Sequence, residues 1–82
     1  MYSRIIENLV DKKVAILGFG KEGISTYNFI RRYLKDKELT IIDANEDLLK
    51  TCEFLSNDSN VSLVLGEGYL DNLNDYDIII KS

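Results

Sequence analysis

Three glycines in the pattern Gly-x-Gly-x-x-Gly, at positions 18, 20 and 23, constrain this chain more than any other feature. The four residues before them, 14–17, are all apolar, which is typical of a strand covered on both faces of a sheet. The residues after them, 22–35, carry apolar side chains at helical spacing. A strand, a glycine turn and a helix in this order favour an α/β fold built around a parallel sheet.

The remaining apolar patterns predict further strands and helices on both sides of this unit. We expect a second helix that begins at Ala44 or, as the better N-cap, at Asn45, and a polar loop over 56–60. Alternating strands and helices indicate a Rossmann-like three-layer α/β domain with parallel strands in the order 3-2-1-4. The other expected elements are a helix over 2–10, strands over 39–42, 61–65 and 77–80, and a helical turn over 69–73. The core-facing residues of the second helix are Leu48, Leu49, Cys52 and Leu55.

Length and composition limit the functions open to this chain. Its 82 residues form one small domain, and a formal charge of −4 argues against nucleic acid as a partner. The absence of histidine excludes His general-base chemistry and most zinc and haem sites, and the single Cys52 forms no metal cluster. No apolar run approaches the roughly 18 residues that span a bilayer, so we expect a cytoplasmic protein without membrane contact.

The glycine turn has the chemistry of a phosphate-binding site. Gly18 allows a tight turn, Gly20 lets the backbone approach a phosphate, and Gly23 lets the helix pack against the sheet. The free amides and positive dipole at the start of a helix favour an anion. Asp43 follows Gly23 by twenty residues, where a carboxylate accepts hydrogen bonds from a ribose or a base. This pattern predicts nucleotide or diphosphate binding; the alternative is a tight crossover whose glycines serve packing alone.

The neighbouring side chains carry weaker signals. Lys21 is either a point charge for a phosphate or a solvated loop lysine. Glu22 stabilises the dipole in the first turn of the helix and is expected to point away from a bound phosphate. The aromatic residues 27, 29, 33 and 54 are expected in or beside the core, and the acidic stretch 71–77 is expected to be a solvated turn.

Two segments resemble a known family. Residues 14–25, Val-Ala-Ile-Leu-Gly-Phe-Gly-Lys-Glu-Gly-Ile-Ser, resemble the opening of the Mur ligases. Residues 77–82, Asp-Ile-Ile-Ile-Lys-Ser, are similar to the fourth strand of that family, which runs on into Ser-Pro-Gly. The resemblance covers nearly the whole chain but only the N-terminal domain of the family. It implies that residues 1–82 are a fragment without the central ATPase and C-terminal domains, cut before the final strands of the domain.

The resemblance implies a function as well. In the family this domain holds the UDP part of a UDP-N-acetylmuramoyl substrate, within a ligase that forms an amide bond in peptidoglycan synthesis. The likeness is greatest to members that add D-glutamate to the L-alanine of that substrate, with ATP and magnesium as cofactors. ATP and magnesium are held outside this domain, so we expect the fragment to be non-catalytic and to bind neither. The whole enzyme is expected to be a monomer, and the fragment to self-associate through its truncated sheet edge.

By position, the resemblance also assigns contacts to individual residues. The turn that carries Lys21 and Glu22 would lie along the diphosphate and uridine, mainly through backbone amides. Asp43 would accept from the uracil edge, and Ser82 would approach the diphosphate from the other side of the crevice. The full set of implied UDP contacts is Gly18, Gly20, Lys21, Glu22, Gly23, Asp43, Ala44, Asn45 and Ser82.

Two other classes of function remain open from the residues. A regulatory NAD(H)-binding domain, such as those that control potassium transport, would use the same glycine turn and place Asp43 on the adenosine ribose. An interaction domain would keep the fold and leave the crevice empty. Calorimetry with UDP, UDP-N-acetylmuramoyl-L-alanine, NAD and NADH separates these three possibilities.

Overall fold

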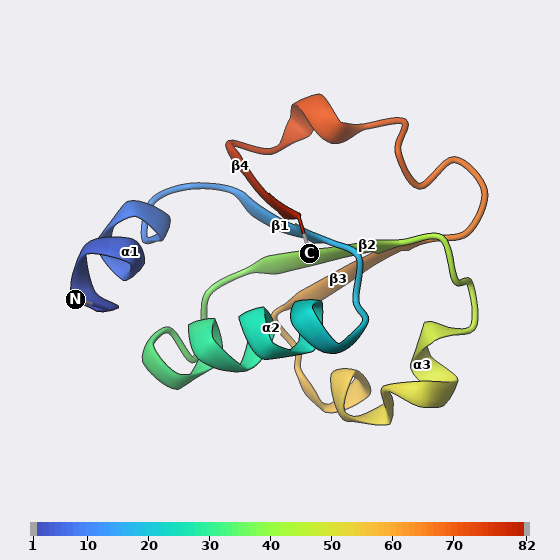
Figure 1. The fold of residues 1–82 in the computed structure, drawn as a ribbon, viewed down its shortest axis with the longest axis horizontal. Coiled ribbons are helices and arrows are strands. Elements are labelled where there is room, and N and C mark those ends of the chain that lie inside the picture. Colours follow the sequence, from blue (N-terminus) through green and yellow to red (C-terminus); the bar gives the residue numbers. More distant parts are fainter. Residues whose placement is uncertain (1, 82) are drawn as a thin grey trace.

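Four parallel strands form the sheet at the middle of the structure (Figure 1). The computed structural model describes residues 2–81, and the side chains from Arg4 onward. The strand order is β3-β2-β1-β4, which confirms the expected order and the Rossmann-like α/β class. The strands are β1 (Val14–Leu17), β2 (Leu39–Asp43), β3 (Val61–Leu65) and β4 (Ile78–Lys81).

Helices and connections lie on the two faces of this sheet. In Figure 1, α2 and α3 lie below the sheet, and the connection between β3 and β4 passes above it. That connection is the third layer, and it carries only a short 3-10 helix. The helical elements are α1 (Tyr2–Leu9), α2 (Lys21–Tyr33), α3 (Leu48–Thr51), and the 3-10 helices η1 (Glu53–Asn57) and η2 (Leu73–Asp75).

The main core lies between the sheet and its helices. Val14 and Ile16 alternate with Ala15 along β1, so they point to the same face of the sheet. They pack with Ile41 of β2 and Ile30 of α2, and all four side chains are at most 1 % exposed. Burial of each such side chain contributes about 1.5–3 kcal/mol, which explains why the unbroken apolar run at 14–17 becomes the central strand.

The segment after β2 differs from the sequence prediction. The expected helix from Asn45 is reduced to the single turn of α3, and the chain continues from Glu53 as η1. Leu48, Cys52 and Leu55 are buried as predicted, but Leu49 is 40 % exposed, so its assignment to the core was wrong. Successive residues of a helix are about 100° apart, and one short turn buries only the side that carries Leu48.

The connection after β3 also differs in detail. The helical turn expected over 69–73 is replaced by two tight turns, in which Tyr69 donates to the carbonyl of Gly66 and Asp71 to that of Gly68. Both glycines have a positive φ, of 79° and 81°, that side chains rarely tolerate. The short helical element of this connection comes later, as η2.

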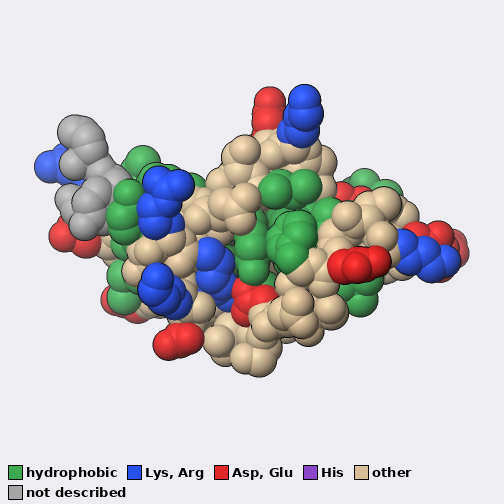
Figure 2. Space-filling model, turned by 90° about the horizontal axis from the view of Figure 1, so that it is seen from below, with side chains coloured by type: hydrophobic (Ala, Val, Ile, Leu, Met, Phe, Trp, Pro, Cys, Tyr) green, Lys and Arg blue, Asp and Glu red, His purple; other side chains and the backbone are tan. Residues whose placement is uncertain are grey.

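The surface on the helix side keeps some apolar character. Figure 2 shows hydrophobic side chains gathered near the middle of this face, beside acidic and basic ones. Phe54 is 41 % exposed, and its ring contacts those of Phe19 and Tyr27, with centroids 6.3 and 5.7 Å apart. Among residues 2–81, no helix has the length and apolar character needed to cross a membrane.

Candidate functional site

A pocket of about 460 Å³ opens at the carboxyl ends of the strands. Leu17 ends β1, Asp43 ends β2 and Lys81 ends β4, so the last residues of three strands line this pocket. Ligands of open parallel sheets bind at this edge, where the strand order reverses between β1 and β4. The lining residues are Leu17, Gly18, Asp43, Ala44, Tyr69, Leu70 and Lys81.

The glycine turn between β1 and α2 is built as its spacing predicts. Gly18 has φ of +89°, and its amide donates to the carbonyl of Ile42 at 2.8 Å. A Cβ atom at Gly23 would lie only 2.1 Å from the carbonyl oxygen of Gly18, so this glycine permits the close packing of helix on turn. A Cβ atom at Gly20 would meet nothing within 4 Å. Gly20 therefore has open space beside it, in contrast to the closely packed Gly23.

The start of α2 presents backbone amides beside this open space. Gly20 is the N-cap of the helix and, as a glycine, supplies no side-chain acceptor to the amides of the first turn. The first amides of an α-helix have no intrahelical carbonyl to bind, and the helix dipole is positive there. Lys21 and Glu22 are both exposed, and Glu22 lies in the first turn. This geometry suits an anion bound by backbone amides.

Asp43 fastens the end of β2 to the glycine turn. Its Oδ2 accepts the amide of Phe19 at 2.7 Å, and its Oδ1 accepts the amide of Asn45 at 2.8 Å. Sequence spacing pointed to Asp43 as a ligand acceptor but not to this role in holding the turn. A carboxylate offers about four lone-pair positions, so each oxygen keeps one for a further donor. Asp43 can therefore hold the turn and contact a ligand at once.

Of the predicted site residues, Gly18, Asp43 and Ala44 line the pocket, whereas Gly20, Lys21, Glu22 and Gly23 are not among its lining residues. Ala44 lines it directly, whereas Asn45 is exposed beyond it and uses its Oδ1 to accept the amide of Asp47 at 2.9 Å. Ser82 lies outside the described residues. Sequence reasoning missed Tyr69, Leu70 and Lys81 as lining residues. Lys81 ends β4, and Tyr69 and Leu70 follow β3, so their positions at the ends of strands were a usable signal. The two turns that position Tyr69 and Leu70 had no such signal.

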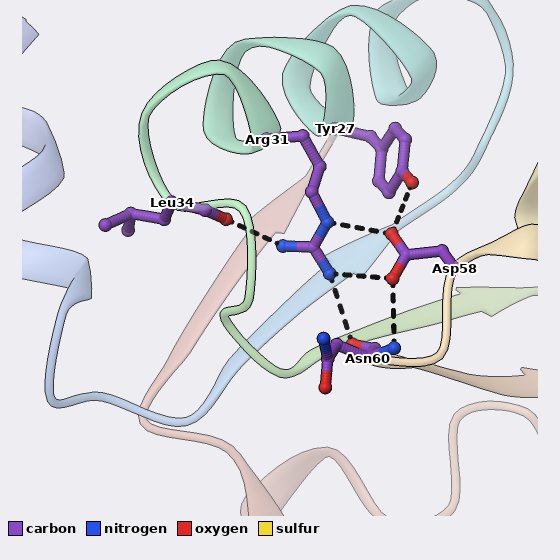
Figure 3. A network of polar contacts seen from close by, with 5 residues as sticks. All are labelled: Tyr27, Arg31, Leu34, Asp58 and Asn60. Atoms are coloured by element: carbon purple, nitrogen blue, oxygen red, sulfur yellow. Dashed lines mark hydrogen bonds and ion pairs between the residues drawn. The ribbon is translucent and has the colours of Figure 1, made fainter.

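A second polar cluster lies away from the pocket, near the amino ends of β2 and β3 (Figure 3). Arg31 of α2 donates to both carboxylate oxygens of Asp58, at 2.8 and 3.3 Å, and Tyr27 donates its hydroxyl to the same group. Arg31 also donates to the carbonyls of Leu34 and Asn60. The side chains of Arg31 and Asp58 are only 13 % and 12 % exposed. The cluster therefore ties α2 to the start of β3.

The protonation of Asp58 reflects these partners. Burial by itself would raise the pKa of this carboxyl group. The hydrogen bonds from Arg31 and Tyr27, and from the amide of Asn60, outweigh burial and lower the pKa from 3.8 to about 2. Burial and the neighbouring carboxylate raise the pKa of Tyr27 above 10.0. Because every strong donor here is satisfied within the chain, we interpret the cluster as structural.

Metal binding has no support in the part of the chain that the structure describes. Within residues 2–81, no three His, Cys, Asp or Glu side chains lie close enough together to hold an ion. The thiol of Cys52 is buried in the main core, which confirms its expected place on the core-facing side.

Comparison with known proteins identifies relatives of this chain. It is 32 % identical over 81 residues to a protein of Clostridium botulinum named UDP-N-acetylmuramoylalanine–D-glutamate ligase. It is 34 % identical over 77 residues to a protein of the same name from Acetivibrio thermocellus. These matches cover 99 % and 93 % of this chain but only 18 % and 16 % of the relatives.

No family model matches the chain, and no solved structure matches it at a significant level. The two relatives nevertheless carry the same name, and their matches cover nearly every residue of this chain. The resemblance to the Mur ligase family is thus confirmed by direct sequence similarity, over a stretch that makes up less than a fifth of either relative.

Proposed function

We propose that this domain binds the UDP part of UDP-N-acetylmuramoyl-L-alanine, as the substrate-binding portion of a ligase that adds D-glutamate in peptidoglycan synthesis. One observation carries the proposal: the open glycine turn, the carboxylate of Asp43 and the pocket all meet at the carboxyl edge of the sheet. The names of the two relatives support the choice of a UDP-linked substrate over other nucleotides. The compartment that fits such a role is the cytoplasm.

Each part of the site has its own task in this proposal. The diphosphate lies against the amides at the start of α2, on the open side of Gly20. Lys81, at the end of β4, lines the pocket and supplies a positive charge to the bound nucleotide. Asp43 accepts a hydrogen bond from the uridine with the lone pairs that the chain leaves free. The expected contact of Ser82 with the diphosphate stays a prediction, because Ser82 lies outside the described residues.

The chemistry of the whole enzyme lies outside these residues. In this proposal ATP and magnesium activate the alanine carboxylate, and the amine of D-glutamate then forms the amide bond. The role of residues 1–82 is to bind and orient the UDP end of the substrate. The isolated domain is therefore expected to bind UDP without consuming ATP.

Titration of the domain with UDP, followed by amide chemical shifts in NMR spectra, tests the proposal. We expect shifts at the glycine turn and at Asp43, and an affinity for UDP higher than that for NADH. Gly20→Ala places a methyl group where the diphosphate would lie and should lower UDP affinity about tenfold or more, or about 1.4 kcal/mol. Asn28→Ala, on the exposed side of α2, is the matched control and should bind UDP as the wild type does.

An NAD(H)-binding domain is the competing outcome of the same titration. Such a domain would use Asp43 on a ribose hydroxyl and would prefer NADH to UDP. Tighter binding of NADH, or equal UDP binding by Gly20→Ala and the wild type, would contradict the proposal.

A further inference from the structure

We propose that Tyr69 forms the aromatic wall against which the nucleobase stacks, which makes it a specificity-determining residue of the pocket. This inference rests on the proposed function, because it requires a nucleotide in that pocket. It assigns a role to a residue that the glycine motif and its acidic partner do not include. It also answers which side chain covers the base, given that Ala44 and Asn45 after Asp43 offer no ring and no long side chain.

The backbone holds Tyr69 next to Asp43. The amide of Gly66 donates to the carbonyl of Asp43 at 3.0 Å, and the amide of Tyr69 donates to the carbonyl of Gly66 at 3.1 Å. Two successive hydrogen bonds therefore connect the carboxylate residue to the aromatic one. Gly66 is buried and has a positive φ, so the turn between them is tightly defined.

The lining of the pocket fits a flat base better than a charged group alone. Tyr69 is half-buried, and with Leu17, Leu70 and Ala44 it makes most of the wall apolar. Asp43 supplies an acceptor at one side of that wall. A uracil ring has apolar faces and an N–H on its edge, so stacking and one hydrogen bond to a carboxylate satisfy both. Inorganic phosphate or pyrophosphate has no face to stack.

A second tyrosine in the same connection gives a matched control. Tyr76 is also half-buried, but its ring lies beneath Lys13, with Nζ 5.4 Å from the centroid, and it does not line the pocket. Tyr76→Ala therefore removes an equal ring from the same connection without touching the site.

Calorimetry with UDP and with inorganic pyrophosphate on wild type, Tyr69→Ala, Tyr69→Phe and Tyr76→Ala tests the inference. Stacking of a base on an aromatic side chain is worth about 1–3 kcal/mol, so Tyr69→Ala should lower UDP affinity between roughly 5-fold and 150-fold. Affinity for pyrophosphate should not change. Tyr69→Phe keeps the ring and should bind UDP within about twofold of the wild type, as should Tyr76→Ala.

The wild-type protein supplies a readout that needs no variant. The ring protons of Tyr69 should shift upfield in NMR spectra when UDP is added, and stay in place when pyrophosphate is added. Failure of the wild type to bind UDP would overturn the proposed function and this inference with it. Normal UDP binding with an unshifted Tyr69 ring, or equal losses of UDP and pyrophosphate affinity in folded Tyr69→Ala, would overturn this inference alone.

Discussion

Replacing Gly23 by alanine should destabilise the fold far more than the same replacement at Gly20. The new Cβ atom would lie 2.1 Å from the carbonyl oxygen of Gly18 and 3.0 Å from its carbonyl carbon, well inside the 3.4 Å at which ordinary contact begins. The glycine turn cannot easily shift, because the amide of Gly18 is hydrogen-bonded to the carbonyl of Ile42 and the amide of Phe19 to the carboxylate of Asp43. Helix α2 must therefore move away from β1.

The size of this effect follows from the cost of overpacking. Extra methyl groups in well-packed sites cost typically about 1–3 kcal/mol and sometimes more. Because backbone atoms of the turn are the obstacle, we expect the upper end, about 3 kcal/mol or more. A domain of 82 residues has a free energy of unfolding of about 4–12 kcal/mol at 0.05–0.15 kcal/mol per residue. Gly23→Ala therefore removes a large share of the total stability.

Urea unfolding followed by circular dichroism measures the loss. Gly20→Ala is the matched control, since a Cβ atom there meets nothing within 4 Å and the φ of −80° is open to alanine. We expect this variant to unfold within about 0.5 kcal/mol of the wild type, or to gain slightly from reduced freedom of the unfolded chain. Equal stability of the two variants would show that Gly23 is not there for close packing.

Three further perturbations test other parts of the molecule. Asp43→Ala should weaken UDP binding by about 1–3 kcal/mol in calorimetry, and unchanged affinity would remove Asp43 from the site. The same variant should lower the free energy of unfolding by a similar amount, because the amide of Phe19 loses its acceptor. Because the pKa of Asp58 is lower in the folded state, its stabilising effect is present above about pH 4 and lost as the pH falls towards 2. Urea unfolding of the wild type should therefore show a loss of stability as the pH falls from about 4 to 2, and Asp58→Asn should lack this loss. An equal loss in Asp58→Asn would contradict the stabilising ion pair of Asp58 with Arg31. Strand β4 pairs only with β1 among the described residues, so light scattering should detect self-association through this edge at high concentration; a strict monomer would argue against it.

The sequence was informative where the physical signal is local. The apolar run at 14–17 and the helical spacing after Gly23 each mark an element by its own periodicity, and the alternation of such elements leaves few topologies for a parallel sheet. The three glycines act through backbone geometry within six residues of each other. For these reasons the sheet order and the shape of the glycine turn were predictable.

The features that the sequence did not predict depend on contacts between residues that are far apart in the chain. Asp58 meets Tyr27 and Arg31 across 31 and 27 positions of the chain, and nothing in a polar loop marks which acid will do so. Leu49 looked like a core residue because its helix was expected to continue past one turn. Tyr69 lies at the pocket because of two glycine turns, and the first turn is attached to β2 by the hydrogen bond from Gly66 to Asp43, a contact between distant residues that the glycines do not reveal.

The double role of Asp43 has a consequence for recognition. A free carboxylate at the end of a strand would lose rotamer freedom when it binds a ligand, and that loss would weaken binding. Here the amides of Phe19 and Asn45 already hold both oxygens in place. The hydrogen bond from Phe19 also fixes the glycine turn, whose open amides would face the diphosphate in the proposed complex. A nucleotide would therefore meet a carboxylate and an amide cradle that are set relative to each other before it arrives, and the ordering cost would already have been met in folding.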